Sequence, residues 1–177
     1  KTGYTGSKTM IAGKQEYHHS QVGVLHYQKT VEMAARYQIM LNIHEPIKGT
    51  GIERTYPNIL TREGAKGQEY EGGKIRLNHA TILPFTRMLA GAFDYTPGIF
   101  DLSNPAKRVY TTLARQLAFY VIFYSGMQML ADRPEVYDKY PKVFEFLKEV
   151  PVNWQTTIPL LGKIGEYFVV ARQDRDS

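Results

Sequence analysis

Apolar and polar positions along the chain alternate between helical and strand-like spacing. From Ser20, a residue type that often caps helices, apolar residues recur at helical spacing and predict a helix through Tyr37. The apolar run at 39–43 follows directly and is typical of a fully buried strand. A second short strand is predicted at 58–61, whereas the polar, Gly-rich residues 3–19 predict a long loop.

The alternation continues to residue 149. The pattern predicts a helix at 81–89, a strand at 92–95, a helix at 106–120, a strand at 121–124 and a helix at 134–149. Pro141 should kink or divide the last of these helices. Short apolar strands that alternate with helices indicate an α/β fold with a covered parallel sheet. Four such strands make about half of a TIM barrel, whose catalytic face lies at the strand ends.

The pattern changes after Pro151, where residues 154–158 and 167–171 resemble antiparallel strands. We therefore expect two parts, residues 1–150 and residues 151–177. Residues 173–177 resemble a hairpin turn without its second strand, and the chain begins at Lys1 rather than Met. Both features suggest a piece of a larger product.

Composition narrows the function classes. The chain is 43% hydrophobic and 22% charged, which is typical of a globular protein. Its formal charge is +5, but Lys and Arg are scattered, which argues against a nucleic-acid surface. No apolar stretch approaches the roughly 18 residues of a membrane helix, and the absence of Cys excludes disulfides and thiolate sites. The 13 tyrosines suit either a sugar- or protein-contacting surface or the rim of a core.

Three glutamates fall in one polar, Gly-rich region: Glu45, Glu63 and Glu69. Glu45 and Glu63 follow predicted strands, and Glu69 lies in a glycine-rich loop. Glycoside hydrolysis needs one protonated carboxyl to assist the leaving oxygen and a second, ionised carboxylate to activate water or attack carbon. Carboxylates could also bind Ca²⁺, which prefers oxygen ligands. Their spacing alone fits structural pairing with Lys or Arg as well.

Other chemistries find less support in the sequence. His18 and His19 are adjacent, so their side chains need not converge, and no HExxH motif or Cys/His cluster suggests zinc. Residues 3–9 superficially resemble a phosphate-binding loop but lack the GxxxxGK[ST] spacing. A GxSxG nucleophile elbow is also absent from the sequence.

Three long blocks carry a specific likeness that spans nearly the whole chain: HEPIKGTGIERTYPNILTREGAKGQEYE (44–71), NHATILPFTRMLAGAFDYTPGIF (78–100) and RQLAFYVIFYSGMQMLAD (115–132). They resemble the signature blocks of glycoside hydrolase family 97, which contains exo-acting α-glucosidases and α-galactosidases. The resemblance implies an N-terminal β-sandwich, a central (β/α)8 barrel and a C-terminal β domain. This chain would supply about strands 4–8 of the barrel and the first strands of the C-terminal antiparallel β domain.

The resemblance also implies roles for the three glutamates. The family's calcium ligands map onto Glu45, Glu63 and Glu69, together with a carboxylate from the missing N-terminal part. Its general acid maps onto Glu69. Retaining members carry an aspartate nucleophile where this chain has Gly3, so an inverting mechanism is expected. Glu45 would then act as base with a glutamate upstream of Lys1.

Five further residues carry smaller expectations. The residues expected in the substrate pocket are His44, His79, Asp94 and Tyr95, although Asp94 could equally cap or pair locally. Arg87 is expected to form a structural ion pair on its helix.

The resemblance thus implies a calcium-dependent, inverting, exo-acting α-glucosidase that releases glucose from the non-reducing ends of α-glucosides. The alternatives are a retaining α-galactosidase of the same family and a catalytically incomplete fragment without activity of its own. The expected partners are an α-linked oligosaccharide and the rest of the barrel, namely strands 1–3 and the β-sandwich. No nucleic acid and no membrane span are expected, and the family implies a periplasmic or secreted bacterial protein.

Overall fold

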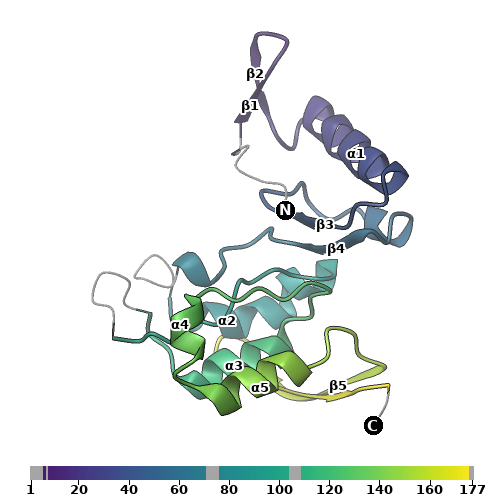
Figure 1. Cartoon of the computed structure of the whole chain (residues 1–177). Coiled ribbons are helices and arrows are strands. Elements are labelled where there is room, and N and C mark those ends of the chain that lie inside the picture. The colour runs from purple at the N-terminus through teal and green to yellow at the C-terminus, as the bar shows by residue number, and fades with distance from the viewer. Residues whose placement is uncertain (1–5, 7, 71–75, 104–108, 176–177) are drawn as a thin grey trace.

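Two parallel strands, β3 (Leu41–Ile43) and β4 (Ile59–Arg62), lie between the N-terminal elements and the C-terminal helices of the computed structural model (Figure 1). The structure describes residue 6 and residues 8–70, 76–103 and 109–175. A parallel bridge between Arg62 and Phe93 places the segment 92–95 beside β4. The two predicted strands at 39–43 and 58–61 are confirmed, whereas the predicted strand at 92–95 is reduced to this bridge.

The helix α1 (Gln21–Arg36) covers the β3–β4 pair, and its predicted position is confirmed. The Ser20 hydroxyl accepts a hydrogen bond from Gly23 N at 3.4 Å and so caps its first turn. One face of α1 packs against both strands. The buried members of this core are Tyr27, Val31, Ala34, Leu41, Ile43, Ile47 and Ile59.

The prediction of a loop through residue 19 is wrong, because β1 (Lys8–Ile11) and β2 (Lys14–Tyr17) form an antiparallel hairpin. Ala12 and Gly13 connect the strands with positive φ angles of 50° and 78°. Two central residues with positive φ are typical of tight hairpin turns. Gly3, the position on which the expected inverting mechanism rests, lies outside the described residues.

The predicted helix at 81–89 is wrong as a continuous element. It is divided into α2 (His79–Ile82), η3 (Leu83–Phe85) and η4 (Arg87–Ala90). Pro84 has no N–H to donate to a preceding turn. Thr86, at φ −131° and ψ −85°, separates the two 3₁₀ segments.

The predicted strand at 121–124 is also wrong, because α3 (Leu113–Ile122) continues through its first half. An apolar run of this length suits either a buried helix or a buried strand. The segment that follows still lies beside β4 and the segment 92–95, since Gly126 N donates to Leu60 O at 3.3 Å and Phe93 N donates to Tyr124 O at 2.8 Å. Residues 104–108, where the predicted helix 106–120 would begin, lie outside the described residues.

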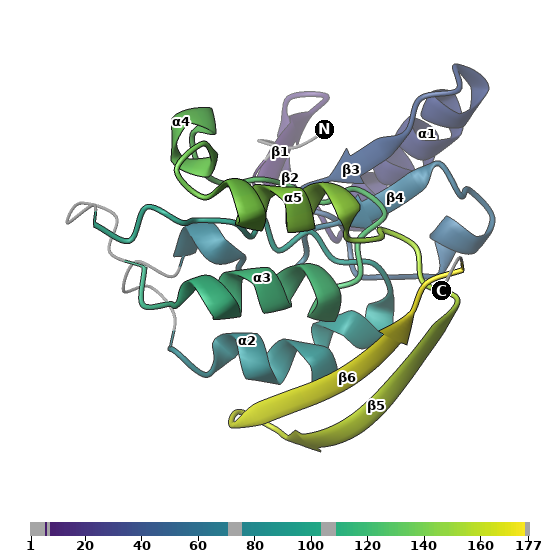
Figure 2. The ribbon, with the colours of Figure 1, turned by 60° about the horizontal axis from the view of Figure 1, so that its bottom comes forward.

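The remaining elements agree with the sequence. Pro141 divides the last helical region into α4 (Pro134–Tyr137) and α5 (Pro141–Glu149). The strands β5 (Thr156–Lys163) and β6 (Tyr167–Gln173) form an antiparallel hairpin, which passes alongside α2 and α3 in Figure 2. Of the predicted terminal turn at 173–177, residues 176–177 lie outside the described part.

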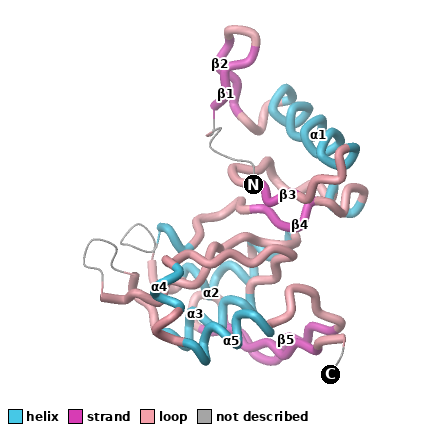
Figure 3. The backbone as a smooth tube through the Cα atoms, viewed as in Figure 1, coloured by secondary structure: helices cyan, strands magenta, loops and turns pink. Residues whose placement is uncertain are grey.

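Long loops and single 3₁₀ turns connect the parallel strands to the elements around them (Figure 3). Two of these turns are η1 (Ile52–Arg54) and η2 (Gln68–Tyr70). In the described residues the strands form three two-stranded sheets, of which β3–β4 is the parallel one. Among the same residues, no helix has the length and apolar character needed to span a membrane.

An aromatic core lies on the other side of the strands from α1. Phe93 and Tyr95, from the segment beside β4, pack against Phe119 and Phe123 at the end of α3. All four rings are at most 3% exposed, so Tyr95, which was expected in the substrate pocket, lies in the core. This packing fixes the position of the segment that carries Asp94.

Candidate active site

The carboxyl ends of β3 and β4 bring together residues that are distant in the sequence. His44 and Glu45 follow β3, and Glu63 follows β4. Glu63 N donates to Ile43 O at 2.9 Å, which continues the parallel pairing by one residue. Because parallel strands end at the same edge, the side chains that follow them share one surface.

The imidazole of His44 bridges two acidic side chains. Its Nε2 lies 2.8 Å from Asp94 Oδ2, and its Nδ1 lies 3.6 Å from Glu63 Oε1. The side chains of His44 and Asp94 are only 10% and 1% exposed. Two of the predicted site residues, His44 and Asp94, are thus in direct contact across fifty sequence positions.

Asp94 accepts further hydrogen bonds that hold it as a carboxylate. Asn42 Nδ2 donates to Oδ2 at 2.7 Å, while Thr96 N and Thr96 Oγ1 donate to Oδ1 at 2.9 Å and 3.0 Å. Burial alone would raise the pKa of Asp94, but the bonds from His44, Asn42 and Thr96 outweigh it and leave the pKa lowered. Thr96, which sequence reasoning missed, adopts a left-handed φ of 55° that is compatible with this turn. The observed contacts make Asp94 a buried support for His44.

Glu63 contacts both of the residues that follow β3, His44 and Glu45. Glu45 N donates to Glu63 Oε2 at 3.2 Å. Burial is the largest influence on the pKa of Glu63 and raises it. The hydrogen bond from Glu45 N and the nearby His44 lower the pKa, whereas repulsion from Glu69 and Glu45 raises it further. Glu45 and Glu69 are therefore both within electrostatic range of Glu63.

Glu45 has an unusual backbone. Its φ of 46° lies in the left-handed region, which costs free energy for a residue other than glycine. Pro46, which is buried, follows directly. Strained residues are concentrated at functional sites, where the surrounding structure holds them in place.

Glu69 lies on η2 and is exposed. The preceding residue anchors it, because Gln68 N donates to Tyr95 O at 2.8 Å. A Cβ on Gly67 would lie 2.6 Å from the same carbonyl, so only glycine allows this close approach. The negative charge of Glu69 is also the main cause of the raised pKa of Tyr70.

His79, predicted in the substrate pocket, lies at the first turn of α2. Its Nε2 lies 2.9 Å from Lys66 O, so it contacts the loop that leads to Glu69. Arg87 differs from the expected helix ion pair, because its guanidinium donates to backbone carbonyls at the ends of β4 and the neighbouring segment.

Calcium would require several oxygen ligands at one point. The carboxylates of Glu45, Glu63 and Glu69 have suitable chemistry, and a cation would relieve their mutual repulsion. In the described part of the chain, however, no three His, Cys, Asp or Glu side chains are grouped closely enough to bind a metal ion. The rings of His18 and His19 do converge, with centroids 3.9 Å apart, but among the described residues they belong to no such group of three either. The described residues do not by themselves make a calcium site.

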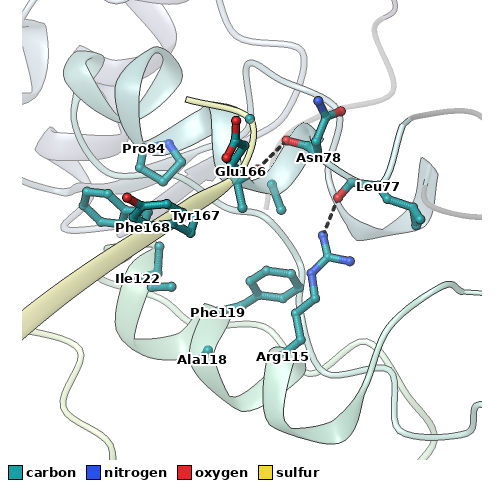
Figure 4. A pocket seen from close by; sticks show the side chains of 13 residues that line it. Leu77, Asn78, Pro84, Arg115, Ala118, Phe119, Ile122, Glu166, Tyr167 and Phe168 are labelled. Atoms are coloured by element: carbon teal, nitrogen blue, oxygen red, sulfur yellow. Dashed lines mark hydrogen bonds between the residues drawn. The ribbon is translucent and has the colours of Figure 1, made fainter. Parts of the chain in front are cut away.

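A separate cavity of about 500 Å³ lies between α2, α3 and the β5–β6 hairpin (Figure 4). Phe119 and Ile122 from α3 and Tyr167 and Phe168 from β6 line it, and Arg115 lies at its side. Its lining residues include none of the six predicted site residues. The cavity is therefore distinct from the acidic region.

Comparison with known proteins identifies relatives of the chain. The model of the family described as glycoside hydrolase 97 matches residues 1–65. A retaining alpha-galactosidase of Bacteroides thetaiotaomicron is 36% identical over 162 residues, which are 84% of this chain and 24% of the relative. A probable retaining alpha-galactosidase of Streptomyces bingchenggensis is 36% identical over 146 residues, which are 82% of this chain and 22% of the relative.

Solved structures are also similar. A glycoside hydrolase family 97 enzyme of Pseudoalteromonas sp. strain K8, in complex with panose, has a TM-score of 0.88 and 44% sequence identity. The match covers 96% of this chain and 27% of that enzyme. The same enzyme in complex with acarbose matches at 45% identity with the same TM-score and coverage. The chain thus spans about a quarter of the length of the relatives it matches.

Proposed function

The chain belongs to glycoside hydrolase family 97, and we propose that the protein that contains it is an inverting, calcium-dependent α-glucosidase. It would release glucose from the non-reducing ends of α-linked oligosaccharides. The observation that carries the proposal is the placement of Glu45 and Glu69 within electrostatic range of Glu63, beside the His44–Asp94 pair at the end of two parallel strands. An inverting glycosidase needs an acid and a base on opposite faces of the sugar.

In the proposed reaction, Glu69 donates a proton to the leaving oxygen. Its exposure on η2 leaves it accessible to an incoming substrate. Glu45, together with a carboxylate from another part of the protein, accepts a proton from the attacking water. His44 is held by Asp94 and would donate to a sugar hydroxyl, and His79 would place the Glu69 loop against the substrate.

The proposed sugar follows from the family members of known structure. The Pseudoalteromonas enzyme, 44–45% identical to this chain, has been solved with panose and with acarbose. Panose is an oligosaccharide of α-linked glucose, which supports an α-glucoside as substrate here.

The second candidate is a retaining α-galactosidase, because the two curated relatives carry that activity in their names at 36% identity. A retaining mechanism requires a carboxylate nucleophile. Gly3, at the corresponding position by the sequence resemblance, supplies none.

We further propose that residues 1–150 form about strands 4–8 of a (β/α)8 barrel and that residues 151–177 begin a C-terminal β domain. The change from the parallel β3–β4 pair to the antiparallel β5–β6 hairpin supports this division. Strands 1–3 and an N-terminal β-sandwich would complete the protein. A crystal structure of the full-length protein would test it, and an open sheet in place of a closed barrel would contradict it. The family also suggests a periplasmic or secreted protein, and cell fractionation would test that location.

Calcium is proposed to bind with Glu45, Glu63 and Glu69 among its ligands and with others from the rest of the protein. When bound, it would neutralise the repulsion between these carboxylates. Terbium luminescence of the full-length protein provides a readout besides activity. Wild-type protein should bind terbium and release it to calcium, and Glu63→Gln should weaken binding; equal binding by both proteins would contradict this ligand set.

The experiment that tests the function compares chromogenic α-glucosides and α-galactosides as substrates of the full-length protein. Proton NMR would follow the anomer of the first sugar released. The proposal expects α-glucoside hydrolysis with release of the β anomer, as inversion requires. Preference for the α-galactoside with release of the α anomer would establish the second candidate instead, and no hydrolysis of either would reject both.

A further inference from the structure

The guanidinium of Arg87 holds four backbone carbonyls. Its Nε donates to Glu63 O at 2.8 Å, and its Nη2 donates to Arg62 O at 2.9 Å and to Ala92 O at 3.0 Å. Its Nη1 donates to Gly91 O at 3.1 Å. These four contacts form what we call the Arg87 clamp.

The Arg87 clamp joins two segments that are adjacent through a single strand bridge. One pair of carbonyls belongs to the end of β4, and the other belongs to the residues just before Phe93. Between the two segments, Asp94 N donates to Arg62 O at 2.9 Å. With so little ladder pairing, the guanidinium supplies much of the hydrogen bonding that fixes their separation.

The same two segments carry the side chains on either side of His44. Glu63, whose carbonyl accepts from Arg87 Nε, places its carboxylate 3.6 Å from His44 Nδ1. Asp94, two residues after Ala92, places its carboxylate 2.8 Å from His44 Nε2. A change in the separation of the segments would therefore alter both contacts of His44.

The surroundings of Arg87 are built for a planar group. Its Cζ lies 4.9 Å from the centre of the Phe93 ring, and a Cβ on Gly64 would lie 3.0 Å from its Nε. Burial, followed by repulsion from Arg62, lowers the pKa of Arg87 to about 10, so it remains protonated at neutral pH. A lysine could reach some of these carbonyls but could not present the planar fork of donors that holds all four.

We propose that Arg87 is a positioning residue that sets the geometry of Glu63, His44 and Asp94 for the reaction. The proposal rests on the function proposed above. Arg87 contacts no reacting group itself; it acts through the carbonyls of the two segments. A displacement of about 1 Å at a catalytic site can lower a rate by about 100-fold.

The test replaces Arg87 by Lys in the full-length protein. We expect kcat on an α-glucoside to fall by about 10- to 100-fold, with KM within about 3-fold, because the reacting groups move while the substrate pocket remains. Arg115→Lys is a matched control. Arg115 also donates to two carbonyls, Tyr110 O and Leu77 O, and its Cζ lies 5.2 Å from the centre of the Phe119 ring, but it lies at the separate cavity. The kcat of the Arg115→Lys variant should change by less than about 2-fold.

A second pair of variants covers the case in which Arg87→Lys does not fold. Gly64→Ala keeps Arg87 but introduces a methyl group 3.0 Å from its Nε, whereas the control Gly51→Ala meets no atom within 4 Å. Both glycines have similar positive φ angles, 78° and 82°, so an alanine is strained at either position. Only Gly64→Ala should lower kcat, by about 10-fold.

Hydrogen exchange separates the clamp from the proposed function. The amides of Glu63 and Asp94 should exchange faster in Arg87→Lys than in wild type, and should be unchanged in Arg115→Lys. If wild type hydrolyses no α-glycoside, the proposed function fails, and these two amides still decide whether the clamp fixes the segments. Equal loss of kcat in Arg87→Lys and Arg115→Lys, or unchanged exchange at both amides, would overturn the proposal.

Discussion

Asp94 receives four polar contacts at one buried carboxylate, from Asn42, from His44 and from the backbone and hydroxyl of Thr96. Burial of an unpaired carboxylate is unfavourable, so these contacts decide whether the residue stabilises the fold. They leave the pKa of Asp94 lowered despite its burial. The ionised form is therefore the one that the folded protein favours.

This shift predicts how stability depends on pH. The unfolded chain binds a proton at Asp94 near pH 3.9, above the lowered pKa of the folded state, so stabilisation is complete above that pH. It is lost as pH falls further, through the folded pKa. Asp94→Asn should lower the free energy of unfolding by about 1–3 kcal/mol at pH 7. Urea unfolding should show this difference shrink as pH falls from about 4 to about 3.

The control for this prediction is Glu145→Gln on the exposed side of α5. It should change the free energy of unfolding by at most about 0.5 kcal/mol at either pH. A difference between wild type and Asp94→Asn that stays constant from pH 7 to pH 3 would show that the carboxylate of Asp94 is not the stabilising group.

At the level of single residues, the sequence located the acidic groups but not their partners. Glu45, Glu63 and Glu69 were recognisable because two follow apolar runs that form buried strands and one lies among glycines. The contact between His44 and Asp94 spans fifty positions and depends on the placement of Phe93 beside β4. No local pattern encodes that placement. For the same reason, Arg87 was expected to form an ion pair on its helix, because the carbonyls it holds are defined only by the fold.

At the level of elements, the segment 96–101 shows how a turn is fixed between helices. Gly98 N donates to Gln116 Oε1 at 2.9 Å, and Tyr137 Oη donates to Gly98 O at 2.8 Å. Gly98 has a φ of 101°, and a Cβ there would collide with the hydroxyl of Tyr120. Side chains of α3 and α4 thus bind the backbone of residue 98 in a conformation and at a distance that only glycine allows.

Gly98→Ala should therefore destabilise the protein by two additive effects. Left-handed strain costs about 1–2 kcal/mol, and overpacking costs about 1–3 kcal/mol more. The matched control is Gly13→Ala, where φ is 78° and no atom lies within 4 Å of the added Cβ. Thermal unfolding should show a clearly larger loss for Gly98→Ala. Equal losses would indicate that backbone strain alone matters and that the packing against Tyr120 does not.

The elements predicted well were those with strong local signals. Ser20 caps α1 as its residue type suggests, and Pro141 divides the last helices because it cannot donate to the preceding turn. The β1–β2 hairpin was missed because Ala12 occupies a left-handed turn position that Asn or Gly usually marks. The run 121–124 was assigned to a strand because apolar content does not distinguish a short strand from the end of a buried helix.

At the level of the whole molecule, β3 and β4 form a parallel pair of only two strands within the described residues. Parallel strands are stable chiefly within larger, covered sheets. The chain also covers about a quarter of each relative's length. We therefore expect catalysis only in the full-length protein. Purified residues 1–177 alone should hydrolyse no α-glucoside and should self-associate, as light scattering would show; a monomeric, active chain would contradict this expectation.

The central claim is that Glu69 protonates the leaving group. A variant without the acid should fail only on substrates whose leaving group needs a proton. The direct measurement is the rate of full-length Glu69→Gln on maltose and on α-glucosyl fluoride, each relative to wild type. We predict a loss of about 100- to 10,000-fold on maltose, and a much smaller loss on the fluoride, which departs without protonation. Equal losses on both substrates, or near-normal hydrolysis of maltose, would contradict the assignment of Glu69 as the general acid.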